Sequence, residues 1–176
     1  MKIKSSAYTL FSIVLSMVIL AACGKSPEAA SSVARPGKPE AGKNQMSMKL
    51  SGAEWLSDHN LFGVVHPAGH NKAIMMAGSK GPKNKDEQPF NINLFNADGP
   101  GVYHIKTGNP ELGVAQLLNV SQENFMYGSL MGFDLTVTVI QASKEPTVVE
   151  ATFEGTLTGN AGDTLKVTEG KFSYRE

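Results

Sequence analysis

An all-β domain is the fold that this sequence predicts: an antiparallel β-sandwich or small barrel over residues 47–176. Apolar and polar residues alternate with a period of two in several segments, which is the pattern of strands buried on one face. These segments are short, and turn-forming Gly, Pro, Asn and Asp residues separate them, as in sandwiches and barrels. A stretch of about 130 residues suits a single domain with one core.

The clearest alternation lies in residues 132–141. Its apolar members share one parity and are expected to face the core: Phe133, Leu135, Val137 and Val139. Asp134, Thr136 and Thr138 have the other parity, so that face of the strand is expected to meet solvent.

The C-terminal part predicts a long hairpin. Residues 149–157 and 164–175 both alternate, and a turn-forming stretch separates them. In the second segment the apolar residues change parity between Val167 and Phe172. A change of parity requires a β-bulge, and the pair Glu169-Gly170 is where the sequence allows one.

The earlier strands are shorter and less regular. In chain order they are expected at residues 48–50, 53–56, 61–66, 72–77, 90–95, 102–106, 114–120 and 124–126. Turn formers separate them, for example in Pro67-Ala-Gly69 and Thr107-Gly-Asn-Pro110. Residues 111–118 also admit a short helix, because their apolar residues fit neither period cleanly.

Residues 1–22 have the pattern of a signal peptide. Lys2 and Lys4 precede an uncharged run of sixteen residues, Ala7 to Ala22, that is rich in Leu, Ile, Val and Ala. A helix across a bilayer needs roughly 20 apolar residues, so this run is short for a membrane span and suits the hydrophobic region of a signal peptide. We therefore exclude it from the fold.

The end of this segment, Leu20-Ala21-Ala22-Cys23, resembles the lipobox of bacterial lipoprotein precursors. The resemblance implies cleavage before Cys23 and a thioether-linked diacylglycerol on its sulfur, often with a third fatty acyl chain such as palmitate on the new amino group. Two or more acyl chains anchor a protein stably in a membrane. Gly24 stands where an aspartate would resemble an inner-membrane retention signal, so we expect the outer membrane, with the domain facing the periplasm or the cell surface. The alternatives are an ordinary secretory signal or a core helix with a buried free cysteine.

Residues 23–46 are expected to be the lipidated cysteine and a flexible linker. The linker is rich in Pro, Gly, Ala and Ser, and Val33 is its only branched aliphatic residue. Such a segment buries too little apolar area to offset the entropy of ordering. Its r.m.s. span is roughly 25 to 30 Å and its contour limit is about 80 Å, which lets the domain stand clear of the lipid headgroups.

Charge and cysteine content exclude several classes of function. The chain has 16 basic and 16 acidic residues, and Lys2 and Lys4 leave with the signal peptide, so the remaining formal charge is −2. No nucleic-acid partner is expected at this charge. Cys23 is the only cysteine, so its lipidation leaves no thiol for a disulfide, a thiolate metal site or a nucleophile. No cofactor is expected.

A second resemblance covers part of the domain. Four segments are similar, in this order, to small bacterial β-sheet lipoproteins of uncharacterised function: Ser51-Gly-Ala-Glu-Trp55, Gly101-Val-Tyr103, Phe153-Glu-Gly-Thr-Leu157 and Val167-Thr-Glu-Gly-Lys-Phe172. These motifs consist of turn and core residues. The resemblance therefore implies a fold and transfers no catalytic residue.

Weak candidates for metal ligands are His66, His70, Met75 and Met76, because imidazole and thioether groups both bind copper. The spacing argues against a site. His66 and His70 flank a Pro-Gly turn, and adjacent residues such as Met75 and Met76 point to opposite sides of a strand. We expect exposed loop histidines, one core methionine and no metal.

No catalytic motif is present in the sequence. It contains neither Gly-x-Ser-x-Gly nor His-Glu-x-x-His. Because a triad is recognised by geometry and not by sequence order, a copper-binding or hydrolytic periplasmic domain stays an alternative. Asp58 beside His59 is expected to be a surface polar pair. We expect a protein that is not an enzyme.

The residues Lys72, Lys80, Lys83 and Lys85 form a basic stretch that is a weak candidate for binding an envelope protein or a glycan. A solvated loop, offset by neighbouring acidic residues, is the favoured interpretation. The single tryptophan, Trp55, is expected to be a core or sheet-edge anchor rather than a ligand platform.

Together these observations predict a lipid-anchored envelope protein with a non-enzymatic binding or structural β domain. An inhibitor or immunity-like lipoprotein directed against a periplasmic effector is a more specific alternative. The membrane, reached through the lipid on Cys23, is the most definite of the expected partners.

Overall fold

The computed structural model describes residues 43–66, 69, 72–109, 111–128, 131–132 and 134–176, and the statements below concern these residues. This part of the chain is all-β, with strands in two antiparallel sheets. The strands are β1 Gln45–Leu50, β2 Ala53–Leu56, β3 His59–His66, β4 Ala73–Lys80, β5 Gln88–Phe95, β6 Gly101–Lys106, β7 Gly113–Leu118, β8 Met126–Gly128, β9 Asp134–Lys144, β10 Thr147–Thr158 and β11 Thr164–Arg175. The predicted all-β class is confirmed.

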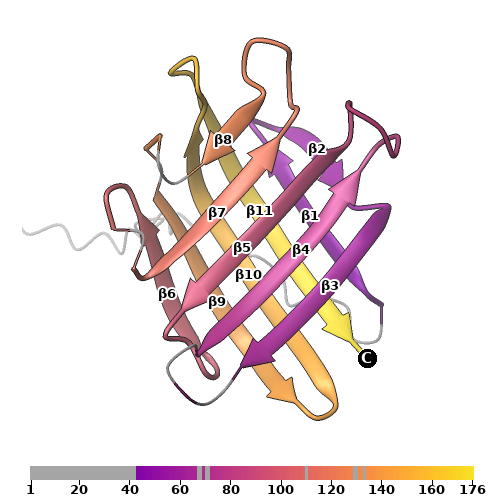
Figure 1. Ribbon diagram of the computed structural model, residues 1–176, viewed down its shortest axis with the longest axis vertical. Helices are drawn as coiled ribbons and strands as arrows, with labels where there is room; N and C mark the ends of the chain where they lie inside the picture. Colours follow the sequence, from indigo (N-terminus) through magenta and orange to yellow (C-terminus); the bar gives the residue numbers. More distant parts are fainter. Residues whose placement is uncertain (1–42, 67–68, 70–71, 110, 129–130, 133) are drawn as a thin grey trace, which may run out of the picture. The chain divides into compact units, whose positions relative to one another are not determined.

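The two sheets are layered as a sandwich. The six-stranded sheet has the order β2-β1-β11-β10-β9-β6, and the five-stranded sheet has the order β3-β4-β5-β7-β8. Figure 1 shows the five-stranded sheet in front of the six-stranded sheet, with the strands of the two layers crossing. Of the two predicted architectures, the sandwich is the one observed.

The core lies between the sheets, where an aromatic cluster joins them. The ring of Trp55 in β2 meets the ring of Phe90 in β5 edge to face, with centroids 6.0 Å apart. Phe90 in turn lies 5.7 Å from Phe153 in β10. Aromatic pairs of this kind contribute about 0.5–1.5 kcal/mol each beyond the area they bury. Trp55 is 2% exposed, which confirms its predicted role as a core anchor on an edge strand.

The predicted C-terminal hairpin and its bulge are both confirmed. β10 and β11 pair along their lengths, and the register shifts between Phe153 and Gly155. Phe153 lies opposite Gly170, and Glu169 has a positive φ of 55°. The bulge changes the parity of β11, so that Val167 and Phe172 both face the core with no exposed surface.

Some element boundaries differ from the prediction. The helix alternative for residues 111–118 is wrong, because residues 113–118 form β7, with Ala115 and Leu117 buried and the alternate residues half-buried. β8 begins at Met126 rather than 124, because Asn124 belongs to a turn in which its N–H donates to Ser121 Oγ at 3.0 Å.

Two further strands are longer than predicted, β1 at its start and β4 at its end. β1 begins at Gln45, two residues before the predicted start, because Met46 is fully buried in the core. β4 continues to Lys80, three residues beyond its predicted end.

Phe133, expected to face the core, lies outside the described residues. The described residues contain no helix that is long and apolar enough to cross a membrane.

Candidate functional site

The structure does not bring the predicted metal ligands together. His66 ends β3 and is exposed, whereas Met76 has no exposed surface and lies in the core. Met75 is half-buried on the opposite face of β4, as predicted for adjacent strand residues. His70 lies outside the described residues. Within the described ranges, no three His, Cys, Asp or Glu side chains are placed to hold a metal ion.

The four candidate lysines do not form one patch. Lys72 precedes β4 and Lys80 ends it, so the length of the strand separates them. Lys72 Nζ forms an ion pair with Asp98 at 2.8 Å, and this contact raises the pKa of Lys72. Lys80 Nζ donates to the carbonyl oxygen of Glu54 at 3.1 Å. Lys83 and Lys85 are exposed in the β4–β5 loop, so only these two match the predicted solvated loop.

The predicted lipid attachment site, Cys23, lies outside the described residues, as does the linker up to residue 42. The lipid anchor and the signal peptide stay predictions from the sequence.

A different surface stands out in the structure: the outward face of the five-stranded sheet, which we call the neutral face. Lys80, at the end of β4, is the only Asp, Glu, Lys or Arg residue in these five strands. Every strand of the six-stranded sheet contains such a residue, for example Lys49, Glu54, Lys106, Asp134, Glu150 and Lys166. An antiparallel sheet usually meets water through a polar face. The neutral face therefore differs from an ordinary solvated sheet surface.

The strand register arranges the outward residues of the neutral face in rows across the sheet. One row consists of Phe62, Ala77, Asn91, Gln116 and Gly128. The adjacent row consists of Val64, Met75, Asn93 and Val114. In the first row Ala77 has a small side chain and Gly128 has none, whereas their neighbours in the row are larger. The surface is therefore lower at Ala77 and Gly128 than beside them. The face is therefore hollowed.

Three hollows lie on this face; the central one, which we call the main hollow, has a volume of about 450 Å³, and the two that flank it have volumes of about 490 and 540 Å³. Its lining includes Met75, Asn93, Val114, Met126 and Met131. A volume of this size falls within the range of about 300–1,000 Å³ that is typical of ligand pockets.

Two further hollows adjoin the main one on the same face. The first shares Phe62 and Asn91 with it and extends along the β3–β5 side to Ser79 and Glu87. The second shares Met75 and extends to the other end of the sheet, where Lys72 and Glu111 border it. The three hollows thus follow the length of β4 and β5, and charged side chains occur only at the ends.

Two carboxamides that line the main hollow have no hydrogen-bond partner in the described part of the chain. The side chains of Asn91 and Asn93 are half-buried, and neither forms a hydrogen bond with a described residue. Gln116, in the same lining, donates from Nε2 to the sulfur of Met126 at 3.1 Å. Both carboxamides keep contact with solvent, and each has donors as well as an acceptor. The two asparagines are therefore placed to bond to a molecule that enters the hollow.

Four exposed large apolar residues lie in or next to the strands of the five-stranded sheet. Phe62 is 43% exposed and Phe95 is 38% exposed, and both project outward from this sheet. Leu112 and Phe125, which are 46% and 55% exposed, directly precede β7 and β8. The other two large apolar residues with this exposure among the described residues, Leu56 and Val102, lie on the edge strands β2 and β6 of the six-stranded sheet.

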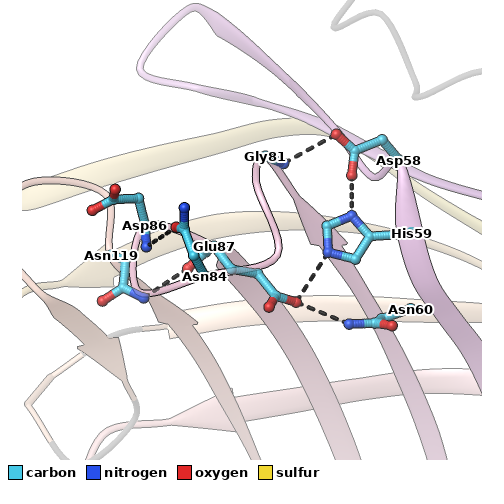
Figure 2. Close-up of polar contacts among 8 residues, drawn as sticks. All are labelled: Asp58, His59, Asn60, Gly81, Asn84, Asp86, Glu87 and Asn119. Atoms are coloured by element: carbon cyan, nitrogen blue, oxygen red, sulfur yellow. Dashed lines mark hydrogen bonds and ion pairs between the residues drawn. The ribbon is translucent and has the colours of Figure 1, made fainter.

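A polar cluster fixes one end of the neutral face (Figure 2). The Nδ1 of His59 contacts Asp58 Oδ1, and its Nε2 lies 3.1 Å from Glu87 Oε1. The same Glu87 oxygen accepts a hydrogen bond from Asn60 Nδ2 at 2.9 Å, and Asp58 Oδ2 accepts one from the Gly81 N–H at 3.0 Å. The cluster therefore ties the start of β3 to the β4–β5 loop.

The predicted surface pair Asp58 and His59 needs correction. The His59 side chain is only 12% exposed, because Glu87, which is 28 residues away in sequence, covers its second nitrogen. The two ring nitrogens point to separate carboxylates and do not converge with them on one point. This arrangement suits a structural tie rather than a metal site or a catalytic dyad.

The carboxylates of this tie should make stability depend on acidic pH. The Gly81 N–H and then His59 lower the pKa of Asp58 below its ordinary 3.8; the Ser79 hydroxyl, followed by Asn60 and His59, lowers the pKa of Glu87 below its ordinary 4.5. A lowered folded-state pKa stabilises the fold above the ordinary value, and the stabilisation is lost as the pH falls through the lowered one. Glu87→Gln should therefore destabilise the fold at pH 7 and differ little from the wild type near pH 3.

The test is urea unfolding of the wild type and of Glu87→Gln at pH 7 and at pH 3, monitored by the fluorescence of Trp55. A difference in the free energy of unfolding that is the same at pH 7 and at pH 3 would contradict the proposed role of the carboxylate.

Comparisons of the chain with protein-family models, with curated proteins and with solved structures found no match. The candidate site therefore depends on the geometry described above.

The neutral face contains no catalytic or metal-binding motif, so such motifs did not predict it. A usable signal was present: residues 59–66, 73–79, 88–95 and 113–118 contain no Asp, Glu, Lys or Arg. Each strand of the six-stranded sheet, in contrast, contains at least one charged residue. A comparison of strand charges would have separated the two sheets.

Proposed function

We propose that the protein is a lipid-anchored binding protein of the bacterial envelope, and that it holds its partner against the neutral face. The observation that carries the proposal is the hollow of about 450 Å³ in a sheet face whose centre has no charge, lined by two carboxamides that bond to no described residue. Burial of apolar surface drives most protein association, and a few placed polar groups give it orientation. The neutral face offers both.

The lipid anchor in this proposal is supported by the sequence. The lipobox-like Leu20-Ala21-Ala22-Cys23 follows a positively charged start and an apolar run. The linker after it is long enough for the domain to reach a partner away from the headgroups. We place no reaction on the domain, and binding is the function that the hollow supports.

Cys23→Ser tests the anchor. We expect complete loss of fatty-acid labelling and release of the protein from the membrane fraction, because the thioether lipid needs the sulfur. Trp55 fluorescence should not change, because Trp55 lies in the core of the described domain. Labelling with radioactive palmitate and membrane fractionation measure both effects. A Cys23→Ser chain that stays acylated and bound to membranes would contradict the lipid anchor.

Photo-crosslinking in living cells tests the face. A benzophenone amino acid in place of Val114, which lines the hollow, should give covalent adducts on irradiation. The matched control replaces Thr138, a half-buried outward residue of β9 in the other sheet. Equal yields of adduct from the two positions, or none from position 114, would contradict binding at the neutral face.

A further inference from the structure

We infer that the neutral face takes an uncharged, extended peptide segment of a partner protein, laid along β5. The inference rests on the proposed function and names the chemistry of the occupant. It follows from the spacing of the two asparagines, from the distribution of charge and from the side chains that line the hollow.

The asparagines match the repeat of an extended peptide. Asn91 and Asn93 are two residues apart on β5 and point outward together. Residues two apart on a strand are separated by about 6.8 Å, and an extended peptide repeats its backbone N–H and C=O groups at the same interval. A carboxamide has both donors and an acceptor, so each asparagine can pair with one peptide group. A hydrocarbon chain would bury both carboxamides without partners, which is unfavourable.

The distribution of charge opposes a charged residue at the centre of the segment. A buried charge needs a partner of opposite sign. Of the charged residues that border the hollows, Lys72 pairs with Asp98, Glu87 bonds to Asn60 and His59, and Glu111 stands at the end of the sheet away from the main hollow. The outward strand residues of the main hollow supply amide, thioether, aliphatic and aromatic groups alone. An uncharged segment is the complement of such a lining.

The lining also suits apolar side chains of varied shape. Met75, Met126 and Met131 border the hollow, and methionine adapts its flexible, polarizable side chain to different partners. Gly128 leaves room for a side chain that points down into the floor. The thioethers of Met75 and Met126 do not form a copper site, because β4 and β8 are three strands apart, about 14 Å.

The length of the segment follows from the hollows. They extend from Ser79 and Pro89 at one end to Ala73 and Phe95 at the other, the full length of β4 and β5. Eight strand residues cover about 27 Å. A peptide of about eight residues fills this distance.

A pair of peptide libraries tests the inference on the full chain in dodecyl maltoside micelles. The first library contains eight-residue peptides made from uncharged amino acids, and the second has Lys or Glu at alternate positions. We expect the immobilised protein to retain at least ten-fold more of the first library. Fluorescence anisotropy with labelled copies of the retained peptides should give saturable binding.

Two lysine substitutions locate the binding. Asn93→Lys places a charge in the hollow and should weaken binding of the retained peptides at least ten-fold. Thr138→Lys adds the same charge at a half-buried outward position of the other sheet and should change binding less than two-fold. Equal effects of the two substitutions, or equal retention of the two libraries, would overturn the inference.

The crosslinking experiment separates this inference from the proposed function. Adducts from position 114 that map to an acyl lipid or to a second copy of the chain would overturn the peptide inference and leave a binding role for the face. Adducts that map to an uncharged segment of another protein would support both. An absence of adducts together with an absence of peptide binding would remove both.

Discussion

Truncation of Phe153 to alanine is expected to lower the free energy of unfolding by about 3–5 kcal/mol. Phe153 is 1% exposed, and its ring lies 5.7 Å from that of Phe90 in the opposite sheet. Alanine would leave a cavity between the sheets and remove one of the two aromatic contacts that join them. Urea unfolding followed by the fluorescence of Trp55, the single tryptophan, measures the change.

The matched control is Val102→Ala. Val102 lies on the edge strand β6 and is 60% exposed, so its truncation should change stability by less than about 0.5 kcal/mol. If Phe153→Ala stayed within 1 kcal/mol of the wild type by the same measurement, the aromatic cluster would not be what holds the layers together.

The packing of Phe153 should affect the neutral face as well as stability. On β5 the core residues Phe90 and Ile92 alternate with the outward Asn91 and Asn93. The same backbone therefore carries the core contact and the carboxamides. We expect loss of packing at Phe153 to loosen the floor of the hollow, so that peptide binding weakens together with stability.

The sequence predicted the all-β class because alternation is a local property that burial on one face imposes. Leu135, Val137 and Val139 are all buried, as their parity required. The bulge near Gly170 was predictable for the same reason, since a change of parity within one strand has few physical explanations. Boundaries were less accurate where side chains such as Asn124 form turns with distant residues, here by accepting a hydrogen bond from the Ala161 N–H.

The neutral face was not predictable from local pattern, because it depends on sheet order. β5 and β7 are neighbours although β6 lies between them in sequence and belongs to the other sheet. Only this order places Asn91 opposite Gln116 and joins the outward residues into one surface. The tie between His59 and Glu87 has the same origin, because no local rule relates these two positions.

The structure separates candidate residues that were grouped by chemical type, because strand geometry was not known from the sequence. Met75 and Met76 are adjacent in sequence, yet the pleat of β4 sends one to the hollow and the other to the core. Lys72 and Lys80 are close in sequence, yet a strand separates them. Residue type indicates possible chemistry, and strand geometry decides which residues act together.

Gly155→Ala is the second substitution for which we expect a large effect, a loss of about 3 kcal/mol or more in the free energy of unfolding. Gly155 has a φ of 151°, which residues with a side chain rarely adopt. A Cβ at this position would also lie 2.0 Å from the carbonyl oxygen of Asp134 and 2.9 Å from the Cα of Leu135. The clash is with backbone, which cannot rotate away.

Gly162→Ala separates the two causes. Gly162 also has a positive φ, 91°, but a Cβ there would meet no atom within 4 Å. We therefore expect Gly162→Ala to cost about 1–2 kcal/mol through the backbone dihedral alone. Both variants are measured by urea unfolding with Trp55 as the probe. Equal losses would mean that the close approach of β9 to β10 contributes nothing.

The expected excess at Gly155 has a structural reason. Gly155 lies at the bulge of the β10–β11 hairpin, where the register shift lets Val167 and Phe172 both face the core. If β9 is pushed away from Gly155, Leu135 and the parity change of β11 are disturbed together. Because the six-stranded sheet supplies Phe153 to the aromatic cluster under β5, a defect at Gly155 should weaken peptide binding even though the hollow lies on the other sheet.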